Sequence, residues 1–228
     1  MAQHIVTSFD EDLKELNSAI GAMGGYAEEL FGNAITALLH SDPDMAQEVI
    51  SKDRIVDAMQ RDIEERAVLL IARRQPVAQD LRETMAAIRI SGDLERVADL
   101  GKNIARRTIA MESTAFRQTL MVGVEHLAQL GLQQMKQVLD AYALRDTAAA
   151  AEVWKNDSEI DAVYTSLFRE LLTYMMEDPR NISRCIHLLF CAKNIERIGD
   201  HATNIAETVH YMVTGQQIEE ERASSTRV

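Results

Sequence analysis

The residues best suited to chemistry are two short acidic motifs that lie far apart in the chain. Glu95 is followed four positions later by Asp99, and Glu196 and Asp200 repeat this spacing in the second half. Residues four apart lie on nearly the same face of a helix, where two negative charges repel unless another group compensates them. Carboxylate oxygens are ligands that hard divalent cations prefer. The motifs could therefore hold metal.

Two further acidic pairs have the same spacing and come earlier in each half. In each pair the first residue continues an apolar stripe of helical spacing, as the two glutamates do, so these side chains should point into a helical core. A carboxylate buried there is costly unless it is protonated, paired or metal-bound. The candidate metal ligands are Asp53, Asp57, Glu95 and Asp99 in the first half, and Asp157, Asp161, Glu196 and Asp200 in the second.

Neighbouring polar residues leave a second role open for these carboxylates. Arg96 and Arg197 follow the two glutamates and could pair with the acidic side chains in a purely structural network. Asn103 and Asn204 continue the acidic stripe by one more turn, as neutral ligands or as hydrogen-bond partners of the ligands. His201 could join the second group or face the solvent. Spacing alone does not decide between a metal site and an ion-pair network.

No motif indicates a catalytic residue. The sequence has no arrangement of Ser, His and Asp, or of Cys and His, that is typical of an activated nucleophile. Cys185 and Cys191 are six positions apart in a helical pattern. That spacing is a rise of about 9 Å, which exceeds the ~7 Å limit for a disulfide. We expect both cysteines to be free, buried thiols.

The elements that must position the acidic side chains are long helices. The chain of 228 residues has only 10 Gly and 3 Pro, too few turn-forming residues for a many-stranded sheet. Each proline stands where a helix would begin, at Pro43, Pro76 and Pro179. The predicted helices span residues 9–40, 43–74, 76–111, 114–144, 147–177 and 179–214. The first has an apolar seam at Leu13, Leu16, Ile20, Met23, Ala27, Leu30, Ala34 and Ala37.

Polar residues and glycine at the helix ends support these boundaries. Ser8 fits a capping box for the first helix, and Asp42 and Asp146 could cap the second and the fifth. The fourth helix has two candidate caps, Ser113 and Thr114. A glycine at position 215 is expected to end the last helix.

The chain is internally duplicated. The motif around Glu95 recurs 101 positions later around Glu196, and Asp53 has its counterpart 104 positions later in Asp157. This period is longer than those of the usual solenoid repeats and indicates a duplicated domain. We predict an all-α fold of two tandem three-helix bundles, over residues 8–112 and 113–215, followed by a polar tail over residues 216–228.

The charge balance excludes several classes of protein. The chain has 24 Lys and Arg against 36 Asp and Glu, a net charge of −12, and its basic residues are scattered. A nucleic-acid partner is therefore not expected, since such binding needs clustered basic residues. No apolar segment approaches the ~20 residues of a membrane-spanning helix. The N-terminus also lacks the basic and apolar regions of a signal peptide. We expect a cytoplasmic protein.

The duplicated motifs resemble those of the PhoU family of phosphate-uptake regulators. The resemblance rests on Glu95-Arg96-x-x-Asp99-x-x-x-Asn103-Ile104-Ala105 and its repeat Glu196-Arg197-Ile198-Gly199-Asp200-His201-Ala202-x-Asn204-Ile205-Ala206-Glu207. Shorter matching segments are Phe9-x-x-x-Leu13, Met23-Gly24-Gly25, Gln75-Pro76-Val77-Ala78 with Asp80-Leu81-Arg82, and Met212-x-x-Gly215. The first copy departs from the family, with Ala98 where Gly is more frequent and Leu100 where His is frequent. The first copy is therefore less typical of the family, and we expect its site to differ in affinity from the second.

The resemblance implies a fold and a role for the chain. It implies two PhoU-like three-helix bundles, often assembled as homodimers, that bind metal at the paired acidic motifs and catalyse no reaction. It also implies a negative regulator of the phosphate-starvation response, contributing to phosphate homeostasis and signal transduction. The implied partners are the ATPase subunit of the high-affinity phosphate ABC transporter and a sensor histidine kinase. Contact with the inner membrane is expected to be peripheral, through the transporter.

The metal and two alternative functions stay open. Oxygen ligands favour Fe, Mn or Mg, as single ions or as a multinuclear cluster, and they allow Zn. One alternative is a carboxylate-bridged metalloenzyme, which needs an open coordination position. Another is a purely structural three-helix repeat adaptor, which should have apolar residues where Glu95 and Glu196 stand.

Overall fold

The computed structural model describes residues 2–111 and 118–218. These residues form six α-helices and one short 3-10 helix, with no strand among them. The helices are α1 (Ala2–His40), α2 (Pro43–Arg74), α3 (Ala78–Ala110), α4 (Gln118–Leu144), α5 (Thr147–Glu177) and α6 (Ile182–Thr214), and the 3-10 helix η1 (Pro179–Asn181) precedes α6. The prediction of an all-α protein with six helices is confirmed.

Two helices begin and end where the sequence predicts. The Asp42 carboxylate accepts the backbone N–H groups of Asp44 and Met45, both at 3.0 Å, and so caps α2. Asp146 caps the first turn of α5 in the same manner, at 2.9 and 3.1 Å. Gly215 adopts a left-handed conformation with φ 74° and ends α6, as its position predicts.

The start of α1 differs from the prediction, whereas the predicted start of α4 lies outside the described residues. The helix α1 begins at Ala2, ahead of the predicted start at residue 9, so the capping box at Ser8 is wrong. Residues 2–8 contain no proline or glycine, and nothing in that segment interrupts the helix. The helix α4 is described from Gln118 onward. Its candidate caps and the predicted boundary between the units, residues 112–114, lie outside the described residues, as does most of the predicted tail, residues 219–228.

The prolines mark chain breaks, but only Pro43 opens an α-helix. Pro76 lies in the extended linker before α3, because Val77 has φ −125° and ψ 158° and the helix begins one residue later. Pro179 opens η1, where the Asp178 carboxylate accepts the backbone N–H of Arg180 at 3.0 Å. All three prolines thus stand at or next to the points where the chain reverses direction between antiparallel helices.

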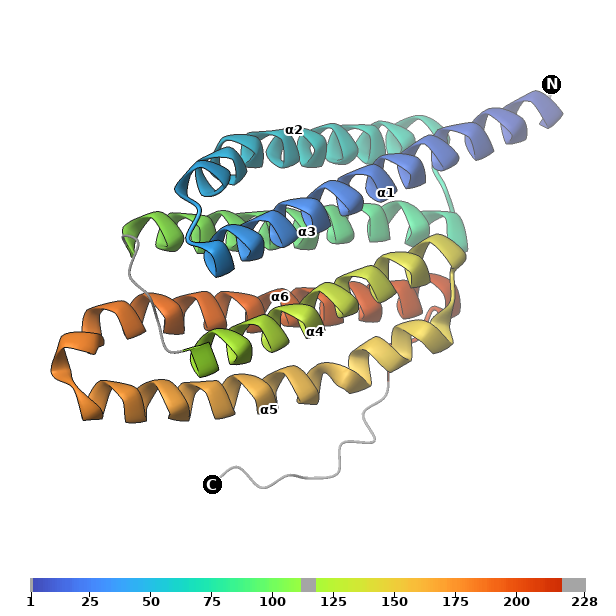
Figure 1. Cartoon of the computed structure of the whole chain (residues 1–228). Helices are drawn as coiled ribbons and strands as arrows, with labels where there is room; N and C mark the ends of the chain where they lie inside the picture. The colour runs from blue at the N-terminus through green and yellow to red at the C-terminus, as the bar shows by residue number, and fades with distance from the viewer. Residues whose placement is uncertain (1, 112–117, 219–228) are drawn as a thin grey trace.

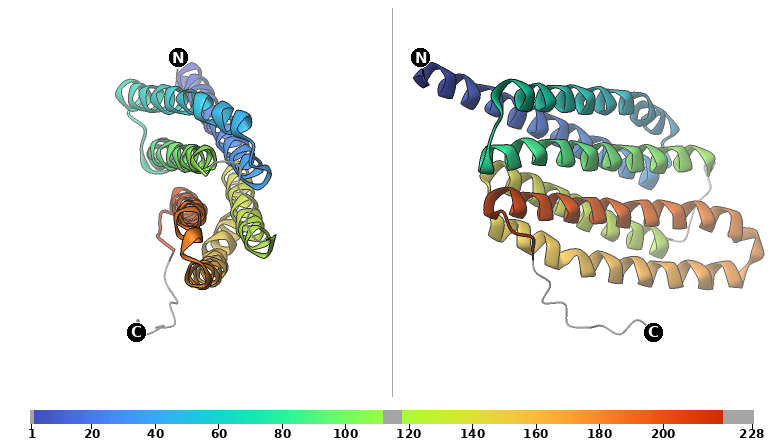
Figure 2. Two further views of the ribbon diagram at one scale, coloured as in Figure 1. Left: turned by 60° about the vertical axis from the view of Figure 1, so that its left-hand side comes forward. Right: turned by 180° about the vertical axis from the view of Figure 1, so that it is seen from behind.

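Two three-helix bundles stack against each other along their lengths (Figure 1). Helices α1, α2 and α3 pack together as the first bundle, and α4, α5 and α6 pack together as the second. The bundles meet through α3 against α6 and through α1 against α4, an arrangement that the turned views also show (Figure 2). The two helices that carry the repeated Glu-x-x-x-Asp motif therefore run beside each other in the middle of the molecule.

The core contains the predicted seam of α1. All eight of its residues are buried, from Leu13 to Ala37. Gly24 follows Met23 of this seam, and a Cβ atom there would overlap the side chain of Leu139 on α4, so the glycine allows the two bundles to approach closely.

Cys185 and Cys191 are free and buried, which confirms the prediction for both thiols. Among the described helices, none combines the length and the apolar character that spanning a membrane requires.

Candidate metal centres

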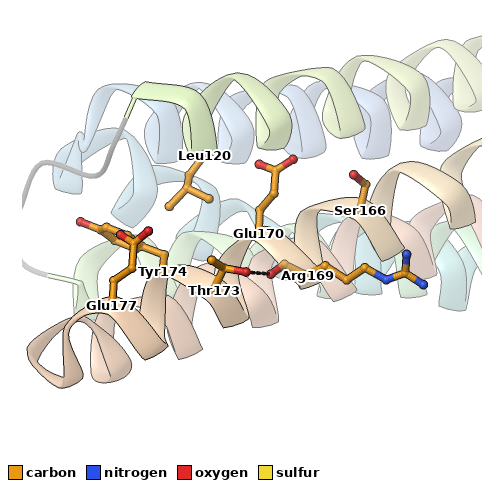
Figure 3. A pocket seen from close by; sticks show the side chains of 7 residues that line it. All are labelled: Leu120, Ser166, Arg169, Glu170, Thr173, Tyr174 and Glu177. Carbon is orange, nitrogen blue, oxygen red and sulfur yellow. Dashed lines mark hydrogen bonds between the residues drawn. The ribbon is translucent and has the colours of Figure 1, made fainter.

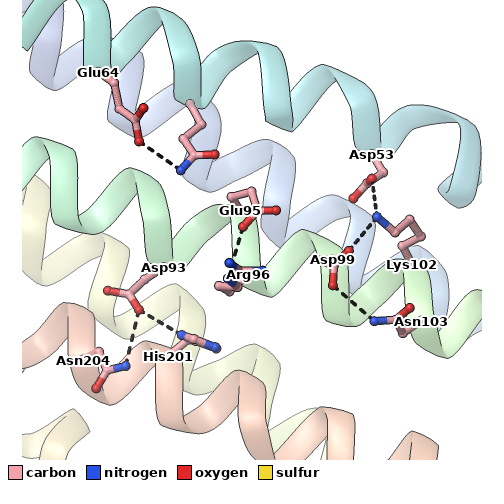
Figure 4. Close-up of polar contacts among 11 residues, drawn as sticks. Asp53, Glu64, Asp93, Glu95, Arg96, Asp99, Lys102, Asn103, His201 and Asn204 are labelled. Carbon is pink, nitrogen blue, oxygen red and sulfur yellow. Dashed lines mark hydrogen bonds and ion pairs between the residues drawn. The ribbon is translucent and has the colours of Figure 1, made fainter.

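The first acidic cluster is formed by Asp53, Asp57, Glu95 and Asp99, and it lies where α2 packs against α3. Figure 4 shows Asp53, Glu95 and Asp99 of this cluster. The helix α2 carries Asp53 and Asp57 one turn apart, and α3 carries Glu95 and Asp99 in the same relation. Asp53 is buried and the other three side chains are half-buried. The spacing on each helix thus places these four residues at a common interface.

A lysine that the sequence motifs did not predict stands inside the first cluster. Nζ of Lys102 lies 2.6 Å from Oδ2 of Asp53 and 2.6 Å from Oδ1 of Asp99, and so links α2 to α3. Burial lowers the pKa of Lys102, but hydrogen bonds and charges from the two aspartates outweigh it and raise the pKa above its usual value. Lys102 stands seven positions after Glu95, on the same helix face, and this spacing could have identified it.

The pKa of Glu95 reflects both its burial and the charges around it in the first cluster. Burial is the main cause that raises its pKa above the usual value. The adjacent Arg96, whose Nε lies 3.5 Å from Oε2 of Glu95, opposes the rise. The negative charges of Asp99, Asp57 and Asp53 add to it. The structure therefore brings the four predicted residues close enough to repel one another.

The second acidic cluster, Asp157, Asp161, Glu196 and Asp200, repeats this arrangement between α5 and α6. Burial raises the pKa of Asp157, and the charges of Asp161 and Asp200 raise it further, whereas side-chain hydrogen bonds from Thr203 and Gln134 oppose the rise. Burial also raises the pKa of Glu196, although Lys193 opposes this, with Nζ 2.5 Å from Oε1. Asp161 and Asp200 are exposed, so the cluster opens to solvent on one side.

Two buried side-chain oxygens at the second cluster have no hydrogen-bond partner, Oε1 of Gln134 and Oε2 of Glu196. The hydroxyl of Thr203 is buried as well, and its hydrogen bond to Asp157 lowers the pKa of that carboxyl. Gln134 comes from α4, where its Nε2 donates to the carbonyl of Val153 at 3.2 Å. A Cβ atom at Gly199 would lie 3.1 Å from the unpartnered Gln134 oxygen, so the glycine leaves room for it. Burying unpaired acceptors is costly, which points to a missing partner.

Gln134 and Thr203 were not predicted as site residues, although the sequence contains a signal for each. Gln134 interrupts an apolar seam of α4 in which Leu127 and Val138 are buried. A polar residue at a seam position marks a buried polar site. Thr203 stands seven positions after Glu196, as Lys102 does after Glu95.

The other predicted polar neighbours have varied surroundings. Asn103 donates from Nδ2 to Oδ2 of Asp99 at 3.2 Å, one of the two roles considered for it. His201 and Asn204 instead contact Asp93 of α3, with distances of 2.9 Å from Nδ1 and 3.3 Å from Nδ2 to its Oδ1. Arg197 is exposed and has no ion pair with the described residues. The pairing across α3 and α6 explains why His201 does not join the second cluster.

The two clusters fit a metal ion differently. No three His, Cys, Asp or Glu side chains of the described residues are already gathered as a metal-binding group. In the first cluster the ammonium group of Lys102 contacts one carboxylate oxygen of Asp53 and one of Asp99. In the second, a buried Glu196 oxygen and the Gln134 amide oxygen have no partner. The all-oxygen chemistry of this cluster suits a hard divalent cation, so its donor set fits a metal.

The surface hollow shown in Figure 3 lies between α4 and α5 and is separate from the acidic clusters. It has a volume of about 340 Å³ and is lined by Leu120, Ser166, Arg169, Glu170, Thr173, Tyr174 and Glu177. The Thr173 hydroxyl donates to the Arg169 carbonyl at 3.0 Å, within α5. None of the predicted site residues lines this hollow.

Comparisons with known proteins match both halves of the chain to one domain. A family model described as the PhoU domain matches residues 20–108 and residues 124–209. A protein of Rhizobium meliloti (strain 1021), named phosphate-specific transport system accessory protein PhoU homolog, is 59% identical over 219 residues, covering 96% of this chain and 92% of its own. The phosphate-specific transport system accessory protein PhoU of Escherichia coli (strain K12) is 39% identical over 214 residues, 94% of this chain and 88% of its own.

A solved structure agrees with these matches. The crystal structure of PhoU from Pseudomonas aeruginosa superposes with a TM-score of 0.88 at 40% sequence identity, covering 91% of this chain and 100% of that chain. The likeness therefore extends over both bundles and the packing between them.

Proposed function

Because this chain belongs to the PhoU family, we propose that it regulates phosphate transport as a non-enzymatic accessory protein. The printed names of its relatives, which are accessory proteins of a phosphate-specific transport system, support this role. In the finer form of the proposal, the protein is a negative regulator of the phosphate-starvation response. It couples the ATPase subunit of a phosphate ABC transporter to a sensor histidine kinase. It acts as a homodimer in the cytoplasm, at the inner membrane through the transporter.

Metal binding is the part of the proposal that rests on this chain's own residues. The observation that supports it is the pair of buried, unpartnered oxygens of Gln134 and Glu196 at the second cluster. Asp157, Asp161, Glu196 and Asp200 would hold the ion, with Fe, Mn or Mg favoured by their oxygen ligands. A bound divalent cation supplies positive charge that offsets the repulsion among the carboxylates. These residues lie on two helices, so holding one ion would tie α5 to α6.

The test compares a variant of the second cluster with a surface control. Glu196→Gln combined with Asp157→Asn removes two carboxylates but keeps the side-chain shapes, and the raised pKa values of both groups favour tolerance of neutral replacements. The control is Glu159→Gln, an exposed acid on α5. Elemental analysis of chelator-free protein measures bound metal, and a phosphate-starvation reporter measures repression in phosphate-rich medium.

We expect the double variant to lose bound metal and to derepress the reporter, while the control keeps both properties. Retained metal in the double variant overturns the metal part of the proposal. Normal repression by a variant that has lost its metal overturns the link between metal and regulation. Normal repression in a strain that lacks the protein altogether overturns the regulatory role.

A further inference from the structure

The two acidic clusters differ in the position of their lysine. Lys102 reaches into the first cluster from α3, where its side chain is 16% exposed and contacts Asp53 and Asp99 on two different helices. The counterpart of Lys102 in the repeat, 101 positions later, is Thr203, whose neutral hydroxyl hydrogen-bonds to Asp157. The first bundle thus contains a positive charge at the repeat position where the second has a neutral hydroxyl.

Lys193 does not play the same part in the second cluster. Its side chain is 45% exposed, and its Nζ contacts a single carboxylate oxygen, Oε1 of Glu196, one turn away on the same helix. The ammonium also lies 5.4 Å from the ring centroid of Tyr164. Oε2 of Glu196 stays buried and unpartnered. Lys193 therefore stands at the rim of the second cluster and leaves its inner oxygens available.

We propose that Lys102 is the resident cation of the first cluster, and that this chain binds a hard divalent cation at its second cluster only. The inference rests on the proposed metal function and says where in the duplicated fold the metal binds. An ion entering the first cluster would have to break both charge-assisted contacts of Lys102. It would then stand beside the positive charge of the displaced ammonium, and like charges repel.

Buried oxygens of the second cluster are available to coordinate a cation, whereas Lys102 occupies the first cluster. Glu196 is 8% exposed and Gln134 is 3% exposed, and each has an oxygen without a hydrogen-bond partner. Carboxylate and amide oxygens are hard donors of the kind that Mg²⁺, Mn²⁺ and Ca²⁺ take. A divalent cation there would satisfy these two acceptors, which no described side chain satisfies.

The first test uses matched aspartates in the full-length protein, with Mn²⁺ as the probe. Asp53 and Asp157 are counterparts 104 positions apart. The chelator-treated wild type, Asp53→Asn and Asp157→Asn are dialysed against Mn²⁺, and bound metal is measured by elemental analysis. We expect one equivalent in the wild type, an unchanged value in Asp53→Asn, and loss of the bound ion in Asp157→Asn.

The second test exchanges the residues that distinguish the repeats. Lys102→Thr gives the first cluster the residue of the second, and we expect it to gain a second equivalent of Mn²⁺. Thr203→Lys gives the second cluster the residue of the first, and we expect it to lose the wild-type equivalent. Circular dichroism with and without Mn²⁺ shows whether each variant is folded. Asp53→Asn and Asp157→Asn decide the question without Lys102→Thr if that variant does not fold.

The outcomes separate this inference from the proposed function. Two equivalents of similar affinity in the wild type, or equal losses in Asp53→Asn and Asp157→Asn, overturn the role of Lys102 while metal binding itself stands. A folded Lys102→Thr variant that gains no Mn²⁺ overturns it as well. A wild type that binds no Mn²⁺, Fe²⁺ or Mg²⁺ overturns the proposed metal function and this inference with it.

Discussion

An ion pair between Glu83 and Arg145 joins the two bundles and permits a quantitative prediction. Glu83 lies on α3, and its side chain is 4% exposed. Nη2 of Arg145, which stands between α4 and α5, lies 2.7 Å from Oε2 of Glu83. Nε2 of Gln79 donates to Oε1 of the same carboxylate at 3.2 Å. Glu83 is thus a buried charge with one cationic partner and one neutral partner.

Arg145→Met removes the cation and keeps most of the aliphatic stem. Breaking a fully buried ion pair by removing one partner costs about 3–5 kcal/mol. The cost here should be lower, because Arg145 is 46% exposed and Gln79 still contacts the carboxylate. We expect the variant to lose about 2 kcal/mol of unfolding free energy. For a chain of this size that loss lowers the Tm by about 4–8 °C.

Urea unfolding followed by circular dichroism measures the change, with a double-mutant cycle to isolate the pair. Glu83→Gln in the Arg145→Met background should recover part of the loss, because it removes the uncompensated buried charge. The control is Arg180→Met, since Arg180 pairs with Asp178 on the surface and is 89% exposed. We expect that control to leave the stability essentially unchanged, because exposed ion pairs contribute little. Equal losses in Arg145→Met and Arg180→Met would refute the reasoning.

Three further predictions follow from single features of the fold. Gly25→Ala should stabilise the protein by roughly 0.5–1 kcal/mol, because the position is helical and an added methyl group contacts no other atom. Gly24→Ala should not stabilise it, because a methyl group there would overlap the side chain of Leu139 on α4. Thermal unfolding of the two variants measures the difference. Burial raises the pKa of Cys191 to about 12 and also raises that of Cys185, so a thiol reagent at pH 8 should modify both only after unfolding. The pKa of Asp157 is raised by burial, so between the usual Asp pKa and this raised pKa the folded metal-free protein holds a proton that the unfolded chain has lost. The unfolding free energy of the wild type should therefore rise as the pH falls through this range, and the stability difference between Asp157→Asn and wild type should shrink. A difference that stays constant with pH would contradict this.

The sequence by itself determined the helices and the location of the acidic residues. The seam from Leu13 to Ala37 and the caps Asp42 and Asp146 depend on residues three or four positions away, which a helix places on the same face or in the same turn. The repeated spacing of the acidic pairs likewise placed both clusters between neighbouring helices. Such features are local and repetitive, so they can be recognised without knowing how the helices pack.

Only the tertiary structure decided what each acidic side chain contacts. Lys102 lies 49 positions from Asp53, His201 lies 108 positions from Asp93, and Arg145 lies 62 positions from Glu83. The spacing of a single helix fixes the face on which a residue lies, whereas a contact between helices also depends on their rotation, crossing angle and relative shift. Two clusters of the same spacing thus acquired different partners, because packing brought an ammonium to one and left unpartnered oxygens in the other.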